Sequence, residues 1–168
     1  MGKSNSMQSY LTFKIGEELF AVNVLKILSI LELVKITKIP RAPKYVRGII
    51  NHHGMALPIV DTHIKFDLEA TNLDSGSCIL VLDVNMEGKS FRIGALVDAV
   101  DEVLELDAAS ILPVPHLGKS YRSEFIDGFY ETEKSVIMIL NIDKLFSEDE
   151  ITVLGYSELV TDENEVKG

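Results

Sequence analysis

The sequence predicts an all-β fold built from small barrels or sandwiches. Short runs rich in Val, Ile, Leu and Phe recur about every 8 to 12 residues, as is typical of such folds. Gly, Pro and Asn separate these runs, and few stretches carry the period of a helix. The third observation is a weak internal repeat, in which both halves of the chain present the same order of motifs. With 168 residues, 46% of them hydrophobic, the chain is long enough for one domain or for two small ones that share a core.

In the first half of the chain, apolar alternation predicts five strands followed by a short helix. The first two strands form a hairpin around residues 16–18, and a turn at residues 51–54 joins the last two, since its glycine permits a positive φ. Pro40 and Pro43 bound the loop between the third and fourth strands, because proline cannot donate to a strand ladder. The expected strands are residues 11–15, 19–24, 25–39, 44–50 and 55–61, and the expected helix is residues 62–68.

The second half begins after a polar loop at residues 69–77, and five more strands are expected in it. A loop runs from Pro113 to about residue 123 and interrupts them. Ser147 and Glu150 have the spacing of a capping box, which predicts the start of a short C-terminal helix. The expected strands are residues 78–84, 90–97, 100–106, 126–130 and 136–141. The expected boundaries are a disordered N-terminus over 1–9, a folded domain over 10–151, and a helix end with an acidic tail over 152–168.

The internal repeat relates positions at two spacings, roughly 80 residues in one stretch and roughly 73 residues in another. At the larger spacing, the matching positions are Gly48, Asp61 and Phe66 with Gly128, Asn141 and Phe146. At the smaller spacing, they are residues 29–33 and Pro40 with residues 102–106 and Pro113. The simplest explanation is a duplicated unit that forms two similar small barrels.

The net charge of −10 is unevenly distributed. Residues 147–168 carry −6 and residues 74–107 also carry −6, whereas residues 35–47 contain five cations and no acid. An acidic protein is repelled by the phosphate backbone, so non-specific binding to nucleic acid is disfavoured. The basic stretch is either a solvated loop or a docking patch for a partner with a complementary acidic surface. A nucleic-acid contact through this stretch stays as a further alternative.

Three features of the sequence indicate in which cellular compartment the protein is found. The N-terminus lacks the apolar core of a secretory signal, and no run of about 18 apolar residues could span a membrane. The single cysteine, Cys78, excludes an internal disulfide. We therefore expect a soluble, cytoplasmic protein.

The sequence offers no constellation that predicts catalysis. Cys78 begins an apolar strand, where an inert thiol is expected, and no nucleophile elbow or phosphate-binding glycine loop is present. The acids Asp98, Asp101, Glu102 and Glu105 are expected to form a solvated strand face. One enzymatic alternative is a small metal-dependent hydrolase that uses His53, Asp61 and His63, two of which would share a face of an extended segment. A generic peptide-binding barrel module is the other alternative.

Five blocks of sequence, taken in order, resemble the CheW family, the coupling proteins of bacterial chemotaxis. Their order and spacing make the resemblance specific, and together they extend over about residues 10–151. The blocks are the hairpin over 13–24 with its Gly-Glu-Glu-Leu-Phe turn, Arg47-Gly48-Ile49-Ile50-Asn51 followed by Gly54 and Pro58-Ile59-Val60-Asp61, Gly94-Ala95-Leu96-Val97-Asp98, then Val100 with Val103-Leu104, and Ile139 to Phe146.

The resemblance implies two intertwined SH3-like, five-stranded β-barrels with a short C-terminal helix, no catalysis and no cofactor. It implies a non-enzymatic adaptor that joins the cytoplasmic tips of methyl-accepting chemoreceptors to the regulatory domain of a CheA-type histidine kinase. The expected location is the cytoplasm, at membrane-associated receptor arrays, with neither nucleic acid nor membrane insertion involved.

Two groups of contact residues follow from the resemblance. The kinase group is Ile39, Arg41, Tyr45, Val46, Arg47 and Gly48. The receptor group is Ile27, Ser29, Ile30, His53, Val97 and Val100. A charge reversal at Arg47 is expected to weaken kinase binding without unfolding the protein.

The chain departs from the family pattern at two positions of the receptor group. Ser29 stands where the family usually has Glu, and His53 stands where it usually has Arg. Because both members of that candidate ion pair are absent, the fold should survive, whereas recognition of the usual receptors is put in doubt. Divergent receptor choice is therefore expected.

Overall fold

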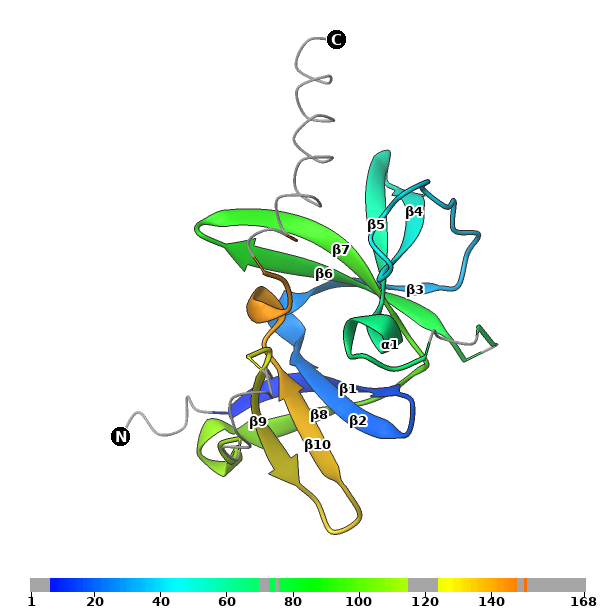
Figure 1. The fold of residues 1–168 in the computed structure, drawn as a ribbon. Coiled ribbons are helices and arrows are strands. Elements are labelled where there is room, and N and C mark those ends of the chain that lie inside the picture. Colours follow the sequence, from blue (N-terminus) through cyan, green and yellow to red (C-terminus); the bar gives the residue numbers. More distant parts are fainter. Residues whose placement is uncertain (1–6, 70–72, 75, 115–123, 148–149, 151–168) are drawn as a thin grey trace.

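The computed structural model describes residues 7–69, 73–74, 76–114, 124–147 and 150. The described chain forms two five-stranded sheets, joined by short turns and a few helical turns (Figure 1). The first sheet has the order β8 (Ala99–Asp107), β1 (Met7–Ile15), β2 (Glu18–Asn23), β10 (Val136–Leu140) and β9 (Ile126–Glu131). The second has the order β3 (Ile27–Glu32), β6 (Cys78–Met86), β7 (Lys89–Val97), β5 (Met55–Asp61) and β4 (Val46–His52). The helical turns are η2 (Val24–Lys26), α1 (Thr62–Lys65), η3 (Ala108–Ser110) and η4 (Ile142–Lys144).

The two sheets have the same topology, and each takes strands from both halves of the chain. In the first sheet, β1 and β2 from the first half lie beside β8, β9 and β10 from the second half. In the second sheet, β6 and β7 from the second half lie beside β3, β4 and β5 from the first half. A parallel pairing joins the two parts in each case, β10 with β2 and β5 with β7. The all-β prediction and the intertwined five-stranded units are confirmed.

Positions related by the larger repeat spacing have the same local structure. The carboxylate of Asp61 accepts hydrogen bonds at the start of α1, and the amide oxygen of Asn141 does the same at the start of η4. Gly48 and Gly128 also correspond, because a crossing segment approaches the backbone closely at both. A single backbone bridge closes each sheet beside its glycine, Thr37 with Ile49 and Leu112 with Phe129.

The hydrophobic core is divided into three clusters. One cluster lies within the second sheet, another lies within the first, and the largest is shared by strands of both. Along β6, Leu80 and Leu82 face the shared cluster, whereas Ile79 and Val81 face the interior of the second sheet. Both faces of this strand are therefore buried, which explains why its sequence is a continuous apolar run rather than an alternating one.

The aromatic side chains at the centre of the molecule form two corresponding pairs. The ring of Phe66 stacks on the ring of Phe125, with centroids 4.8 Å apart, and the ring of Phe146 lies 6.0 Å from that of Tyr45. The larger repeat spacing relates Phe66 to Phe146, and it also relates Tyr45 to Phe125. Each half of the chain thus packs an aromatic ring against the other half.

Three expectations about the elements need correction, and a fourth, the capping box, is confirmed. The N-terminal strand begins at Met7, not at residue 11, because β8 extends to Asp107 and pairs with residues 7–9. The third strand ends at Glu32 rather than at residue 39 and follows a 3-10 turn, and Leu33 and Ile36 pack against the core from irregular backbone. The helix expected to end at residue 68 ends at Lys65. The two reciprocal hydrogen bonds of the capping box join Ser147 and Glu150, whereas the rest of the expected C-terminal helix lies outside the described residues.

Candidate protein-docking surfaces

The kinase group lies where the chain enters β4, and Gly48 determines the backbone there. Gly48 has a φ of 146°, and a Cβ atom added to it would lie 2.1 Å from the carbonyl oxygen of Thr37. The peptide groups of Thr37 and Ile49 exchange two hydrogen bonds, of 2.9 and 2.8 Å, across this point. Only glycine permits so close a crossing, so Gly48 holds the loop that carries Ile39 and Arg41 against the barrel.

Arg47 is an internal anchor as well as part of the basic surface. Its guanidinium lies 3.0 Å from the carboxylate of Asp61, whose side chain is fully buried. That carboxylate also accepts hydrogen bonds from the amides of His63 and Ile64 at the start of α1. Removing the cation would leave a buried carboxylate with fewer partners, which costs free energy of unfolding. A charge reversal at Arg47 is therefore expected to lower the free energy of unfolding, in addition to any effect on partner binding.

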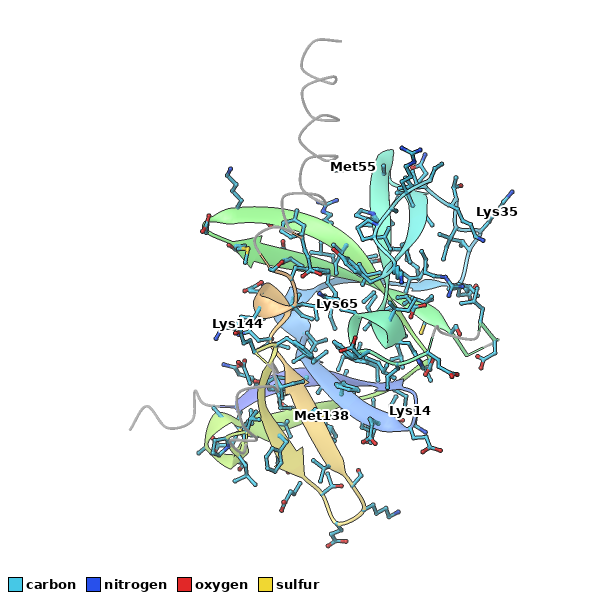
Figure 2. All side chains as sticks on the ribbon, in the orientation of Figure 1. Lys14, Lys35, Met55, Lys65, Met138 and Lys144 are labelled. Carbon is cyan, nitrogen blue, oxygen red and sulfur yellow. The ribbon has the colours of Figure 1, made fainter. Side chains whose placement is uncertain are left out.

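Tyr45 is held in a cage of aromatic and charged groups. The ammonium of Lys65 lies 4.9 Å from the centre of the Tyr45 ring and 5.2 Å from that of Phe146. The same ammonium donates to both carboxylate oxygens of Glu150, at 2.9 and 2.7 Å. Figure 2 shows Lys65 near the middle of the molecule. The cage joins the start of β4, the end of α1 and the C-terminal part of the described chain.

The cage shifts two pKa values. Burial, followed by the negative charge of Glu150 and a hydrogen bond with it, raises the pKa of Tyr45 to about 12. Burial by itself would raise the pKa of Glu150, but hydrogen bonds from Lys65 and Ser147 and the charge of Lys65 together hold it below its ordinary value. Tyr45 therefore stays a neutral phenol and Glu150 stays a carboxylate in the ordinary working range of pH.

Only part of the kinase group is open to a partner. Ile39 is 41% exposed, and Arg41 is exposed with a positive φ of 63°. Val46 packs against the shared core cluster, and Gly48 is buried. Within the kinase group, Ile39 and Arg41 are therefore the two exposed residues, whereas the other four mainly hold the loop in place.

The receptor group is also divided between surface and core. Ile30 is 50% exposed on β3, and His53 is exposed in the turn between β4 and β5. Val97 is fully buried, so it cannot serve as a surface contact, because β7 is covered on both faces. Ile27 and Val100 are partly buried against the shared cluster, and Ser29 is half-buried. Ser29 lies on β3 and His53 follows directly after β4, and these two strands are the opposite edges of the second sheet.

Two exposed leucines in η2 and β3 were not among the predicted contacts. Leu25 is 82% exposed in η2, and Leu28 is exposed on the same face of β3 as Ile30. Alternate residues of a strand share a face, so the spacing of Leu28 and Ile30 was the available signal. Leu25 gave no such signal, because its place in a 3-10 turn interrupts the strand expected from the sequence.

The residues of the enzymatic alternative are engaged in separate structural contacts. α1 begins directly after Asp61, so the segment is not extended and Asp61 caps the helix. The Nε2 atom of His63 lies 2.7 Å from Asp98, which also accepts a hydrogen bond of 2.5 Å from the amide of Gly16. Asp98 is therefore a link between elements rather than part of a solvated face. Within the described residues, no three His, Cys, Asp or Glu side chains are grouped to hold a metal ion.

His52 is the other histidine of note at the end of β4. Its Nε2 atom is buried without a hydrogen-bond partner, beside a hollow of about 10 Å³ that Met55 and Arg92 also line. Burial, followed by the nearby positive charges of His53 and Arg92, lowers the pKa of His52. The side chain is therefore a neutral imidazole in the folded protein at neutral pH.

None of the described helices is long and apolar enough to cross a membrane.

Comparison with known proteins gives a consistent result. The family model for the CheW-like domain matches residues 9–150. A chemotaxis protein CheW of Klebsiella aerogenes is 27% identical over 147 residues, which are 88% of this chain and 86% of that protein. One from Rhizobium meliloti is 31% identical over 88% of this chain and 92% of its own. The crystal structure of the scaffolding protein TtCheW from Thermoanaerobacter tengcongensis superposes with a TM-score of 0.74 at 29% identity, covering 85% of this chain and 90% of that one.

Proposed function

Because the chain belongs to the CheW-like family, whose members are chemotaxis scaffold proteins and not enzymes, we propose that it couples chemoreceptor tips to a CheA-type histidine kinase. The observation that carries this proposal is the match of one family model across both intertwined sheets. The proposed site of action is the cytoplasmic face of membrane-associated receptor arrays.

We assign kinase docking to the loop before β4. Ile39 offers an exposed apolar side chain and Arg41 an exposed cation, and Gly48 holds both against the barrel through the crossing at Thr37. The exposed cations Lys38 and Lys44 flank them, and no acid interrupts residues 35–47. A complementary partner surface would be apolar with acidic residues around it.

We assign receptor contact to β3 and to the turn at His53. Ile30 and Leu28 present an apolar face on an edge strand, with Ser29 between them, and Ile27 supports it from the core side. The replacement of the family's usual Glu and Arg by Ser29 and His53 supports a receptor choice different from that of most relatives. Restoring both residues, with Ser29→Glu and His53→Arg together, should change which receptor tips bind.

The proposal is tested by capture of partners with the tagged full-length chain from its own cells, followed by mass spectrometry. A CheA-type kinase recovered together with chemoreceptors would support it. A kinase without receptors would point to a changed receptor surface, and recovery of neither would refute the coupling role.

Matched variants show which surface each partner uses. Arg41→Glu should reduce kinase recovery, whereas Lys134→Glu, an exposed cation in the turn between β9 and β10, should not. Ile30→Asp should reduce receptor recovery, whereas Val136→Asp, a similarly exposed apolar residue of β10, should not. Equal losses for a test variant and its control would contradict the assignment of that surface.

A further inference from the structure

A surface groove runs along the end of β3 and the irregular segment after it, largely outside the kinase and receptor groups. It consists of a hollow of about 420 Å³, with Leu33, Val34, Ile36 and Leu73 among its lining, and an adjoining hollow of about 540 Å³. Leu33 lines both hollows, so they lie side by side along this segment. Val34 and Leu73 are close to half exposed and line the same hollow, so they give the groove an apolar wall.

The backbone beside this groove has unused hydrogen-bonding capacity. β3 is the edge of its sheet and pairs on one side only, with β6. From Leu33 to Ile36, the peptide groups make no hydrogen bond to another described residue, and pairing resumes only at Thr37. Each of these residues carries a donor and an acceptor, so the segment offers a row of groups on which another chain could pair.

The two ends of the groove carry opposite charge. Lys35 and Lys38 are exposed at one end, and Glu32 and Asp74 are exposed at the other. None of these four side chains forms a salt bridge within the described residues. Figure 2 shows Lys35 projecting from the outer side of the segment between β3 and β4. A ligand that neutralises both ends must itself carry acids at one end and a base at the other.

We propose that this groove binds an extended segment of a partner protein, which adds as a strand beside residues 33–36. The carboxylates of the segment lie over Lys35 and Lys38, its apolar side chains cover Val34 and Leu73, and its basic end faces Glu32 and Asp74. An extended segment fits better than a helix, because a helix satisfies its own backbone groups and would leave those of residues 33–36 unpaired. Arg47 and Ile30 also line the two hollows and Lys38 flanks the assigned kinase surface, but strand addition is tested on the chain alone and requires neither the kinase nor a receptor.

The test uses the full-length chain and a synthetic nine-residue peptide. The peptide has one lysine, then alternating valine and threonine, then three glutamates, and it is made in both chain directions because the groove charges do not fix the strand polarity. Its control is the same peptide with alternate amides N-methylated, which removes donors but keeps charge and side chains. Binding is followed by the amide NMR signals and the hydrogen exchange of residues 33–36.

Binding of the unmodified peptide should shift these signals and slow the exchange of these amides. The double variant Lys35→Glu/Lys38→Glu should weaken binding roughly tenfold, as two exposed ion pairs would. The matched variant Lys134→Glu/Lys144→Glu, which changes two exposed lysines elsewhere, should bind as the unmodified chain does.

Three results would overturn the proposal. The first is the absence of any change at residues 33–36 with millimolar peptide. The second is equal affinity for the N-methylated peptide, which would show attraction by charge without strand addition. The third is binding that is seen only after Glu158, Asp162, Glu163 and Glu165 are neutralised, which would assign the groove to the chain's own C-terminal segment.

Discussion

Replacing Arg47 by aspartate should destabilise the protein strongly, and a second substitution should reverse much of the loss. The guanidinium of Arg47 lies 3.0 Å from the fully buried carboxylate of Asp61. Removing one partner of a buried pair costs about 3 to 5 kcal/mol. Since the Arg47 side chain is 27% exposed and Asp61 keeps its two amide donors, we take the lower limit, about 3 kcal/mol. Repulsion between the two carboxylates adds about 1 kcal/mol even at the dielectric constant of water.

The second half of the chain shows how the loss can be reversed. At the positions that the larger repeat spacing relates to this pair, Asp127 stands for Arg47 and Asn141 stands for Asp61. The side-chain amide of Asn141 donates to the carboxylate of Asp127 at 3.2 Å. The double variant Arg47→Asp/Asp61→Asn copies that arrangement. Asn can also cap α1, as Asn141 caps η4. We therefore expect the double variant to recover at least half of the free energy of unfolding lost in the single variant.

Urea unfolding followed by far-ultraviolet circular dichroism measures these differences, because the chain has no Trp for fluorescence. Lys44→Glu, an exposed change three residues away, serves as the control and should stay within about 0.5 kcal/mol. A loss below about 1 kcal/mol for Arg47→Asp would show that the pair behaves as an ordinary surface pair. A double variant no more stable than the single one would refute the equivalence of the two sites.

Three further predictions concern the backbone crossing and the aromatic cage. Gly48→Ala should lower the free energy of unfolding, measured in urea, by about 3 kcal/mol or more, because the added Cβ would collide with the Thr37 carbonyl. The control Gly88→Ala, whose Cβ would meet no atom within 4 Å, should lower it by only about 1 kcal/mol. In a spectrophotometric titration Tyr45 should ionise near pH 12, and Tyr45→Phe should remove that late step. Because the pKa of Tyr45 is raised in the folded state, the stability that its neutral phenol contributes is complete below about pH 10 and is lost as the pH rises through 12. The pKa of Glu150 is lowered, so its contribution to stability is complete above the ordinary glutamate pKa, near 4.3, and is lost as the pH falls through the lower folded value. The stabilities of Glu150→Gln and of the unmodified chain should therefore converge as the pH falls below about 4.3, and a constant difference would contradict the ion pair with Lys65.

The strands that local chemistry specifies could be predicted well from the sequence. The fifth strand, residues 55–61, was predicted with its observed bounds, because the Asn51-to-Gly54 turn precedes it and a helix cap at Asp61 follows it. His53 and Gly54 both have positive φ, as the two central residues of a tight hairpin require. Such signals lie within a few residues of the element they define.

Features that depend on distant segments could not be predicted. Val97 was expected at the surface, and only the packing of β7 between two clusters shows that it is buried. In the sequence, Arg47 is indistinguishable from the other cations of the basic stretch. Its ion pair with Asp61 depends on the register of β4 with β5, which only the structure shows. The strand expected to continue to residue 39 ends at Glu32, although its β-branched residues favour extended structure, since β6 offers no partner beyond Cys78.

The exchange of strands between the two halves also determines the order in which the protein can be completed during synthesis. β1 pairs with β8, and the hydroxyl of Thr12 bonds to the backbone of Glu102, 90 residues further along the chain. The β1–β2 hairpin therefore leaves the ribosome long before β8, β9 and β10 exist to complete its sheet. Contacts of such sequence separation make folding slow, and they leave apolar strand edges exposed in the meantime. We expect the nascent chain to depend on chaperones until its last strand is made, and two crowded copies to exchange their first hairpins.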